Sequence, residues 1–190
     1  VPDFYQGSEL WALHLVDPDN RQSVDYGRRC ELLDALKAEF DCEPGKQAGR
    51  ARALLDDMAD GRVKLYVTWR GLTARRQMRA LFDDGDYVPL KTSGVHAERL
   101  CAFARVHGET ASITLAPRLI AGIASGDAPP LGEAAWKDTR LEVPRRIAGR
   151  YCNIFTGEVL NCDETGALRA GDVLAQFPDA ILTRGDAPLV

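Results

Sequence analysis

The sequence has little of what marks membrane, nucleic-acid-binding or secreted proteins. Its 190 residues contain no apolar run of about 18 residues, the length that a membrane span requires. The formal net charge of −4 argues against a nucleic-acid surface, which would need a basic stripe. No basic segment followed by an apolar one opens the chain, so no signal peptide is visible. We therefore expect a cytoplasmic protein with no nucleic-acid or membrane partner.

Residues suited to metal binding are also scarce. Five scattered cysteines form no Cys-x-x-Cys pair: Cys30, Cys42, Cys101, Cys152 and Cys162. Three histidines show no ligand spacing with them: His14, His96 and His107. This pattern suits reduced thiols better than a disulfide framework or a zinc site. We expect neither a metal nor a cofactor.

What the chain does contain is an ordinary globular composition, with 45% hydrophobic and 27% charged residues. Its length is compatible with one large or two small domains. In the first half, helical periodicity predicts helices over residues 25–41, 47–60 and 63–78. The last of these opens with strand-like alternation, and the longer period favours the helix. We expect Asp25 to cap the first helix and Gly61 to end the second.

In the second half, short alternating runs between turn residues predict strands over 87–90, 99–106, 110–116, 136–143, 154–160 and 180–183. Residues 124–132 are rich in Gly, Pro and Asp and are predicted to be a loop. Several short strands with regular turns indicate an antiparallel β-sandwich. We therefore predict an α+β chain, with a helical domain at 1–80 and a β-sandwich domain at 81–190.

The opening stretch, residues 1–26, combines aromatic faces with hydrogen-bonding side chains. Its main members are Tyr5, Gln6, Glu9, Trp11, Asp17, Asp19, Asn20 and Arg21. Sugars offer C–H faces for stacking and hydroxyl groups for polar contacts, so this mixture suits a sugar-binding loop. The alternative is a buried strand over 1–5 followed by an irregular loop, in which Asp-Pro and Asp-Asn form turns. The residues alone leave both interpretations open.

Several short motifs are distributed along the whole chain. Residues 1–11 (VPDFYQGSELW), 15–21 (LVDPDNR) and 24–26 (VDY) are similar to the end of the catalytic barrel in the α-amylase superfamily, glycoside hydrolase family 13, and specifically in the maltooligosyltrehalose synthases. Further matches follow in that family's order: 61–65 (GRVKL), 81–82 (LF), 85–87 (GDY), 99, 102–105 (AFAR), 136–139 (WKDT) and 156–157 (TG). The chain departs from the family at 21–25, which read RQSVD where Arg-Arg-Pro-Val-Asp is common.

This resemblance implies that residues 1–80 are the last strand, loop and helices of an eight-fold β/α barrel, followed by a C-terminal antiparallel β-sandwich. The family's catalytic carboxylates would precede Val1, so no catalytic residue is assigned in this chain. In the superfamily, an Asp-Pro-x-Asn-Arg segment binds a glucose unit, which maps substrate binding to Asp17 and Arg21. A carboxylate and a guanidinium fork can share adjacent sugar hydroxyls, while each charge holds the other in place. A structural role for the pair, pinning the loop, is the alternative.

The implied reaction isomerises the α-1,4 bond at the reducing end of a malto-oligosaccharide to an α,α-1,1 trehalose end. The implied partners are the malto-oligosaccharide, the missing N-terminal barrel and a trehalose-releasing hydrolase of the same pathway. The chain alone is expected to be inactive. Two alternatives stay open: part of an amylase-type glycoside hydrolase, and a free-standing β-sandwich that binds glucans or is structural.

A barrel strand without neighbours would leave its backbone groups unpaired. We therefore expect residues 1–25 to be disordered, rearranged or paired with another copy of the chain.

Overall fold

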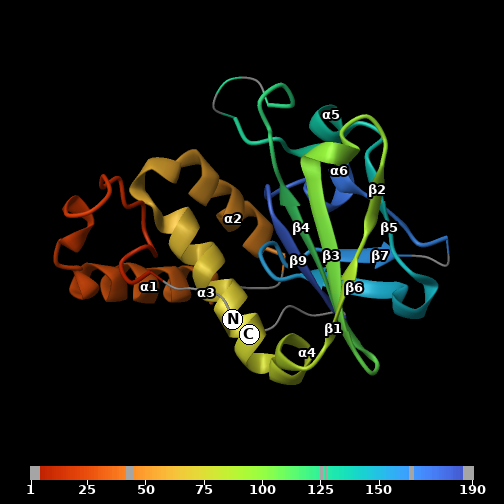
Figure 1. Cartoon of the computed structure of the whole chain (residues 1–190), viewed down its shortest axis with the longest axis horizontal. Helices are drawn as coiled ribbons and strands as arrows, with labels where there is room; N and C mark the ends of the chain where they lie inside the picture. Colours follow the sequence, from red (N-terminus) through yellow and green to blue (C-terminus); the bar gives the residue numbers. More distant parts are fainter. Residues whose placement is uncertain (1–4, 42–44, 125, 127, 163–164, 186–190) are drawn as a thin grey trace.

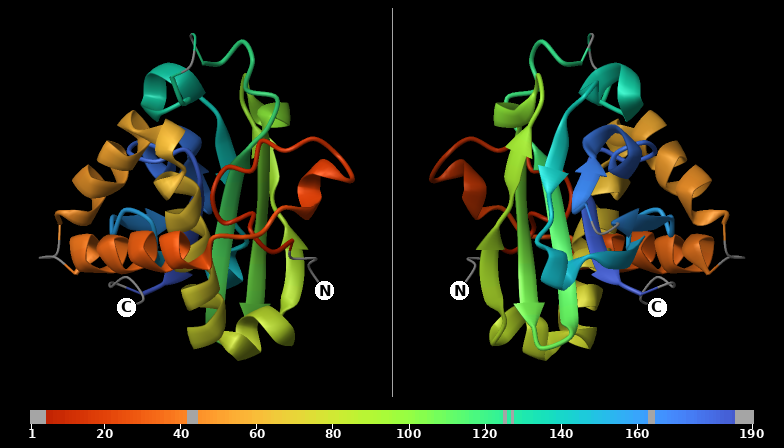
Figure 2. Two further views of the ribbon diagram at one scale, coloured as in Figure 1. Left: turned by 90° about the vertical axis from the view of Figure 1, so that its left-hand side faces the viewer. Right: turned by 90° about the vertical axis from the view of Figure 1, so that its right-hand side faces the viewer.

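The computed structural model describes residues 5–41, 45–124, 126, 128–162 and 165–185. Figure 1 shows helices α1, α2 and α3 on one side of the molecule and the β-strands on the other. The irregular segment 5–25 lies beside these helices, at the end remote from the sheets (Figure 1). Seen from that end, this segment lies in front of strands, with helices α1 and α2 to one side of it (Figure 2, left).

Four α-helices precede the first strand in the described residues: α1 (Tyr26–Phe40), α2 (Gln47–Asp56), α3 (Arg62–Gln77) and α4 (Arg79–Asp83). The predicted helices over 25–41 and 63–78 are confirmed. Asp25 caps α1, since its carboxylate accepts a hydrogen bond from Arg28 N at 2.9 Å. The predicted helix over 47–60 is shorter, because a 3-10 turn, η2 (Met58–Asp60), follows α2. Gly61 then ends this turn at a φ of +80°, as expected.

Only part of α1 faces the core. Leu36 is fully buried, whereas Tyr26 and Cys30 are exposed. The first turn of α1 lies against segment 5–25 rather than the core, and the Tyr26 hydroxyl donates to Gln6 Oε1 at 3.1 Å. The helix therefore presents its apolar face to the core only in its second half.

Nine strands form two sheets in the described residues: β1 (Asp86–Pro89), β2 (Lys91–Ser93), β3 (Leu100–His107), β4 (Thr110–Pro117), β5 (Arg140–Glu142), β6 (Gly149–Asn153), β7 (Val159–Cys162), β8 (Ala167–Arg169) and β9 (Ala180–Arg184). One sheet has the order β1-β3-β4-β9-β6-β7 and the other has the order β2-β5-β8. Every pairing between these strands is antiparallel, which confirms the predicted antiparallel arrangement. The strands predicted at 87–90, 99–106, 110–116 and 180–183 agree with β1, β3, β4 and β9.

The strand predicted over 136–143 is wrong in its first part. Trp136 ends a short helix, α5 (Gly132–Trp136), and only β5 is extended. The Trp136 side chain is fully buried, and its Nε1 donates to Pro130 O at 2.9 Å. Lys137 then takes a positive φ of +51°, which breaks the chain direction before the strand begins.

The strand predicted over 154–160 is also wrong, because its first half is the turn between β6 and β7. The Asn153 side-chain oxygen accepts a hydrogen bond from Phe155 N at 3.0 Å, and Gly157 N donates to Asn153 O at 2.8 Å. An Asn that binds nearby backbone groups in this way competes with strand pairing. Gly157 completes the turn at a φ of +72°.

Two buried clusters form the core. One lies between the two sheets, and its fully buried members include Ile113, Trp136 and Leu141. The other is built on helices α1 to α3 but is completed by Phe155 and Phe177 from the strand-rich half. The core of the helical part therefore crosses the predicted boundary at 80/81, which stays a prediction.

Hydrogen bonds cross the same boundary at the β6–β7 turn. The Tyr66 hydroxyl donates to Phe155 O at 2.6 Å in a fully buried setting. Gln47 Nε2 and Arg70 Nε donate to the neighbouring Ile154 O at 2.9 and 3.0 Å. Buried carbonyl groups need hydrogen-bond donors. Side chains of α2 and α3 supply donors to the carbonyl groups of this turn that are not paired within the sheet.

Segment 5–25 contains no strand in the structure. It consists of turns, irregular backbone and one 3-10 turn, η1 (Asp19–Arg21). The strand predicted over 1–5 lies almost entirely outside the described residues. The barrel origin of residues 1–80 therefore stays a prediction.

Candidate functional site

The two residues predicted to bind substrate form an ion pair in the structure. Arg21 Nε lies 2.5 Å from Asp17 Oδ1, and Arg21 Nη2 donates to Asp17 Oδ2 at 2.9 Å. The two contacts are parallel, which is the strong bidentate geometry of a guanidinium and a carboxylate. Turn η1 makes the pair possible, because it brings residues four apart in sequence to the same side. Both side chains remain open to solvent, with 59% of Asp17 and 72% of Arg21 exposed.

Short-range contacts hold the turn that carries this pair. Asp19 Oδ2 accepts a hydrogen bond from Leu15 N at 2.8 Å. The Tyr5 hydroxyl donates to the backbone oxygen of Asn20 at 3.2 Å, so the start of the segment is tied to the turn. The pair is thus displayed on a fixed turn rather than on a loose loop.

A pocket of about 400 Å³ opens beside the turn, between segment 5–25 and the first turn of α1. Its lining mixes aromatic, amide and charged side chains with small residues: Tyr5, Gln6, Gly7, Trp11, Ala12, His14, Asn20, Gln22, Ser23, Val24, Asp25 and Arg29. Asp17 and Arg21 are not in this lining. The pocket and the ion pair are neighbouring features of one segment, not a single cavity.

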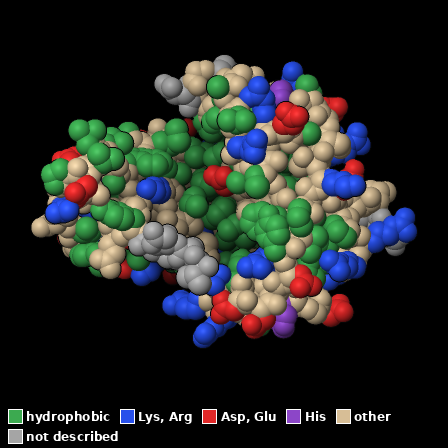
Figure 3. Space-filling view, in the orientation of Figure 1, with side chains coloured by type: hydrophobic (Ala, Val, Ile, Leu, Met, Phe, Trp, Pro, Cys, Tyr) green, Lys and Arg blue, Asp and Glu red, His purple; other side chains and the backbone are tan. Residues whose placement is uncertain are grey.

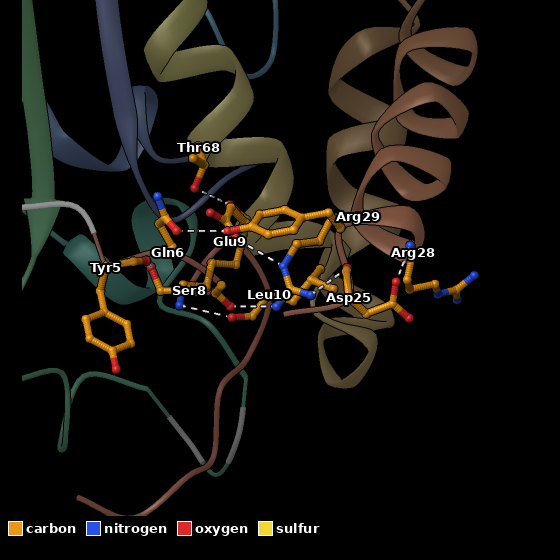
Figure 4. Close-up of polar contacts among 12 residues, drawn as sticks. Tyr5, Gln6, Ser8, Glu9, Leu10, Asp25, Arg28, Arg29 and Thr68 are labelled. Atoms are coloured by element: carbon orange, nitrogen blue, oxygen red, sulfur yellow. Dashed lines mark hydrogen bonds and ion pairs between the residues drawn. The ribbon is translucent and has the colours of Figure 1, made fainter. Parts of the chain in front are cut away.

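Arg29, near the start of α1, binds the segment at both of its ends. Its Nε donates to Glu9 Oε2 at 2.9 Å and its Nη2 donates to Gly7 O at 2.6 Å. Its Nη1 donates to Asp25 O at 3.0 Å. Figure 4 shows the Arg29 and Glu9 side chains directed toward one another, while Arg28 points away from the segment.

A second set of contacts joins the segment to α3 and the turn before it. Trp11 Nε1 donates to Met58 O at 2.5 Å. Lys64 Nζ donates to Leu10 O at 3.2 Å and lies 5.5 Å from the centre of the Trp11 ring. The Glu9 carboxylate and the Trp11 indole N–H are therefore both occupied by contacts within the chain, although 47% of Trp11 remains exposed.

The surroundings of Glu9 favour its ionised form. Burial alone would raise the pKa of the Glu9 carboxyl, but hydrogen bonds from the backbone at Glu9, from Arg29 and from the backbone at Gly7 lower it overall. Only 33% of the Glu9 side chain and 18% of the Arg29 side chain are exposed. The sequence did not indicate a role for Arg29. Arg28 and Arg29 are adjacent arginines in the first turn of α1, and nothing in the sequence distinguishes the one that contacts the segment.

In the described ranges, no three His, Cys, Asp or Glu side chains are grouped closely enough to hold a metal ion. None of the described helices combines the length and the apolar character needed to cross a membrane. The expected cytoplasmic location stays a prediction.

Comparison with known proteins shows that the chain is similar to one segment of a synthase several times its own length. That synthase is maltooligosyltrehalose synthase. Two Mycobacterium tuberculosis proteins, from strains CDC 1551 and H37Rv and provisionally named maltooligosyl trehalose synthase, are 29% identical over 187 residues. A solved structure of a mutant maltooligosyltrehalose synthase from Arthrobacter ramosus matches 97% of the chain with 32% identity and a TM-score of 0.70.

The extent of these matches confirms the resemblance seen in the sequence. They cover 98% of this chain and 19% of each Mycobacterium protein, and 20% of the Arthrobacter chain. The chain therefore spans about a fifth of the length of the curated relatives it matches. No family model matches the chain.

Proposed function

We propose that the chain is the C-terminal part of a maltooligosyltrehalose synthase. The observation that carries this proposal is the similarity to that enzyme over 98% of the chain, joined to a TM-score of 0.70. The whole enzyme would isomerise the reducing-end α-1,4 bond of a malto-oligosaccharide to an α,α-1,1 bond. The carboxylates for this step are expected in a barrel outside these residues, so the chain alone would be inactive. A trehalose-releasing hydrolase would then consume the product.

In this enzyme, Asp17 and Arg21 would bind one glucose unit of the substrate. A sugar presents neighbouring hydroxyl groups, which can donate to the carboxylate and accept from the guanidinium. Because each charge already has its partner, the pair is held ready and little freedom is lost on binding. Its exposure leaves the outer edges of both groups accessible to a ligand.

The apolar side chains of the same segment support a large protein partner. Leu13, Leu15 and Val16 are 94%, 78% and 85% exposed. Figure 3 shows hydrophobic side chains at the end of the molecule where the segment lies. Neighbouring apolar side chains left exposed in this way commonly mark an interaction surface. We assign this surface to the barrel of the longer enzyme.

Product analysis with the full-length enzyme tests the reaction. Incubation with maltopentaose should lower the reducing power of the solution, since a trehalosyl end has no free anomeric hydroxyl. An amylase-type hydrolase would raise the reducing power instead. That result would refute the synthase proposal and favour the hydrolase.

Substitution of the ion pair tests the binding role. Asp17→Asn should raise KM for maltopentaose about tenfold, the expected cost of losing one charge-assisted hydrogen bond. Arg21→Ala should act in the same direction and increase the share of hydrolysis. Asp34→Asn is the matched control, because Asp34 lies on the exposed face of α1 and contacts only Lys37, at 3.3 Å, among the described residues. If Asp17→Asn behaves like Asp34→Asn, the pair does not bind substrate.

The free-standing glucan-binding module is tested on the chain alone. We expect no detectable binding when it is titrated with maltopentaose, because the rest of the cleft would be absent. Binding in the millimolar range or tighter would favour the module.

A further inference from the structure

We infer that Arg29 is a positioning residue. It closes segment 5–25 by linking the beginning of the segment to its end, and it thereby fixes the position of the Asp17–Arg21 pair. This inference rests on the proposed function, because the pair that Arg29 would position is the one proposed to bind substrate. Arg29 itself does not touch the pair or, in this proposal, the substrate.

The geometry of closure is specific to one guanidinium. Its three nitrogens donate to Glu9 and Gly7 at the beginning of the segment and to Asp25 at its end, at 2.9, 2.6 and 3.0 Å. The planar guanidinium spreads its donors over three nitrogens at fixed positions, which match three acceptors that lie apart from one another. A lysine ammonium at this position can keep the ion pair with Glu9 but cannot reach all three acceptors.

Burial separates Arg29 from an ordinary surface arginine. Its side chain is 18% exposed, whereas that of the adjacent Arg28 is 60% exposed and lies 3.8 Å from Glu31. Arg29 is thus partly shielded from water, and residues 7–25 supply its three acceptors. A partly buried fork with three acceptors loses more from substitution than an exposed ion pair does.

The contacts continue from the base of the segment to the ion pair. Gln6 and Tyr5 directly precede Gly7, so their positions depend on the residue that Arg29 holds. Tyr26, in the first turn of α1, donates to Gln6 Oε1 at 3.1 Å. The Tyr5 hydroxyl donates to Asn20 O at 3.2 Å, and Asn20 adjoins Arg21. The position of Arg21 therefore depends on the first turn of α1 through two contacts, from Tyr26 to Gln6 and from Arg29 to Gly7.

The decisive variant is Arg29→Lys in the full-length enzyme, with Arg28→Lys as the matched control. In Arg29→Lys, the hydrogen-bonded amides within residues 8–24, those of Ser8, Leu15, Asp19 and Arg21, should exchange about tenfold faster, the cost of losing one hydrogen bond to a charged group. KM for maltopentaose should rise about tenfold while kcat changes less, because substrate binding rather than the chemical step depends on the pair. Arg28→Lys should change neither measurement.

A double substitution separates positioning from general stability. In the Asp17→Asn background the pair no longer binds, so adding Arg29→Lys should raise KM less than about twofold. Independent effects, in which the two increases in KM multiply, would overturn the inference. Unchanged hydrogen exchange over residues 8–24 in Arg29→Lys would overturn it as well.

The same variants distinguish this inference from the proposed function. If Asp17→Asn leaves KM unchanged while Arg29→Lys accelerates exchange in the segment, the proposed substrate site fails and the closure by Arg29 stands. If Asp17→Asn raises KM while Arg29→Lys leaves both KM and exchange unchanged, the substrate site stands and the positioning role is wrong.

Discussion

Replacing Tyr66 with Phe tests whether the helices and the sheets unfold as one unit. Tyr66 is fully buried on α3, and its ring stacks on Phe40 with centroids 4.2 Å apart. Its hydroxyl crosses to the strand-rich half, where it donates to Phe155 O at 2.6 Å. Tyr66→Phe removes this bond and keeps the ring, so the core loses a polar contact without gaining a cavity.

The expected cost follows from the burial of the acceptor. A buried carbonyl that loses its donor costs about 1–3 kcal/mol. With a urea slope of about 2 kcal/mol per M, the midpoint of unfolding should fall by about 0.5–1.5 M. Tyr151→Phe is the matched control in the other core, because the Tyr151 hydroxyl donates to Ile147 O at 2.5 Å and its ring is fully buried.

Two tryptophans allow each core to be followed separately. The ring centroids of Trp69 and Tyr66 lie 6.1 Å apart in the helical cluster, and Trp136 is buried between the sheets. Replacing Trp11 and either Trp136 or Trp69 with Phe leaves one fluorescent probe in each version. In each version we expect the tryptophan fluorescence and the far-UV circular dichroism to report the same urea midpoint, and Tyr66→Phe to lower that midpoint by the same amount in both versions.

A fluorescence midpoint that differs from the circular-dichroism midpoint of the same version would refute this reasoning. So would a Tyr66→Phe variant that shifts the Trp69 transition and leaves the Trp136 transition in place. Either result would mean that the predicted boundary at 80/81 separates two independent folding units, despite the hydrogen bonds and apolar contacts that cross it.

Two further predictions concern charge and backbone geometry. Because the pKa of Glu9 is lowered in the folded chain, its ionised form stabilises the fold above the ordinary value of 4.5. The difference in urea midpoint between the native chain and Glu9→Gln should therefore be largest near neutral pH and shrink as the pH falls below 4.5; a constant difference would contradict it. Gly94→Ala would place a Cβ 2.7 Å from Asp138 O at a φ of +97°, so it should cost more than about 2 kcal/mol in urea unfolding. Gly108→Ala is the control, since its Cβ would meet nothing within 4 Å at a φ of +57°, and an equal loss in both variants would refute the clash.

Helices α1 and α3 and the longer strands could be predicted because their apolar residues repeat with one period over many positions. In β3, Leu100, Ala102 and Ala104 are buried, as the predicted alternation requires. The same reasoning failed at 136–143 and 154–160, where side chains rather than periodicity decide the backbone. The buried indole of Trp136 and the turn-forming amide of Asn153 leave no such regular signal. Short strands β2 and β8, of three residues each, carry too few positions for a period to be seen.

The site was predictable to a similar extent. Asp17 and Arg21 could be named because they stand four residues apart in a segment that resembles a known family, and the structure brings them together. Arg29 could not be named, since its three acceptors lie in residues that the sequence places up to 22 positions away. Which of two adjacent arginines turns inward depends on where the segment returns to the helix, and no local pattern records that path.

The contacts of segment 5–25 suggest why its charged pair and its apolar side chains lie on the same stretch. Arg29, Lys64 and the Trp11 indole hold the segment mainly by hydrogen bonds to backbone oxygens. Such bonds fix the path of the chain but bury little of the segment's apolar surface, which leaves Leu13 and Val16 available to another surface. In the proposed enzyme that surface would be the barrel, and the segment would be clamped between barrel and helices. The Asp17–Arg21 pair would then stand at the edge of the contact, where a glucan can reach it while the segment itself is held from both sides.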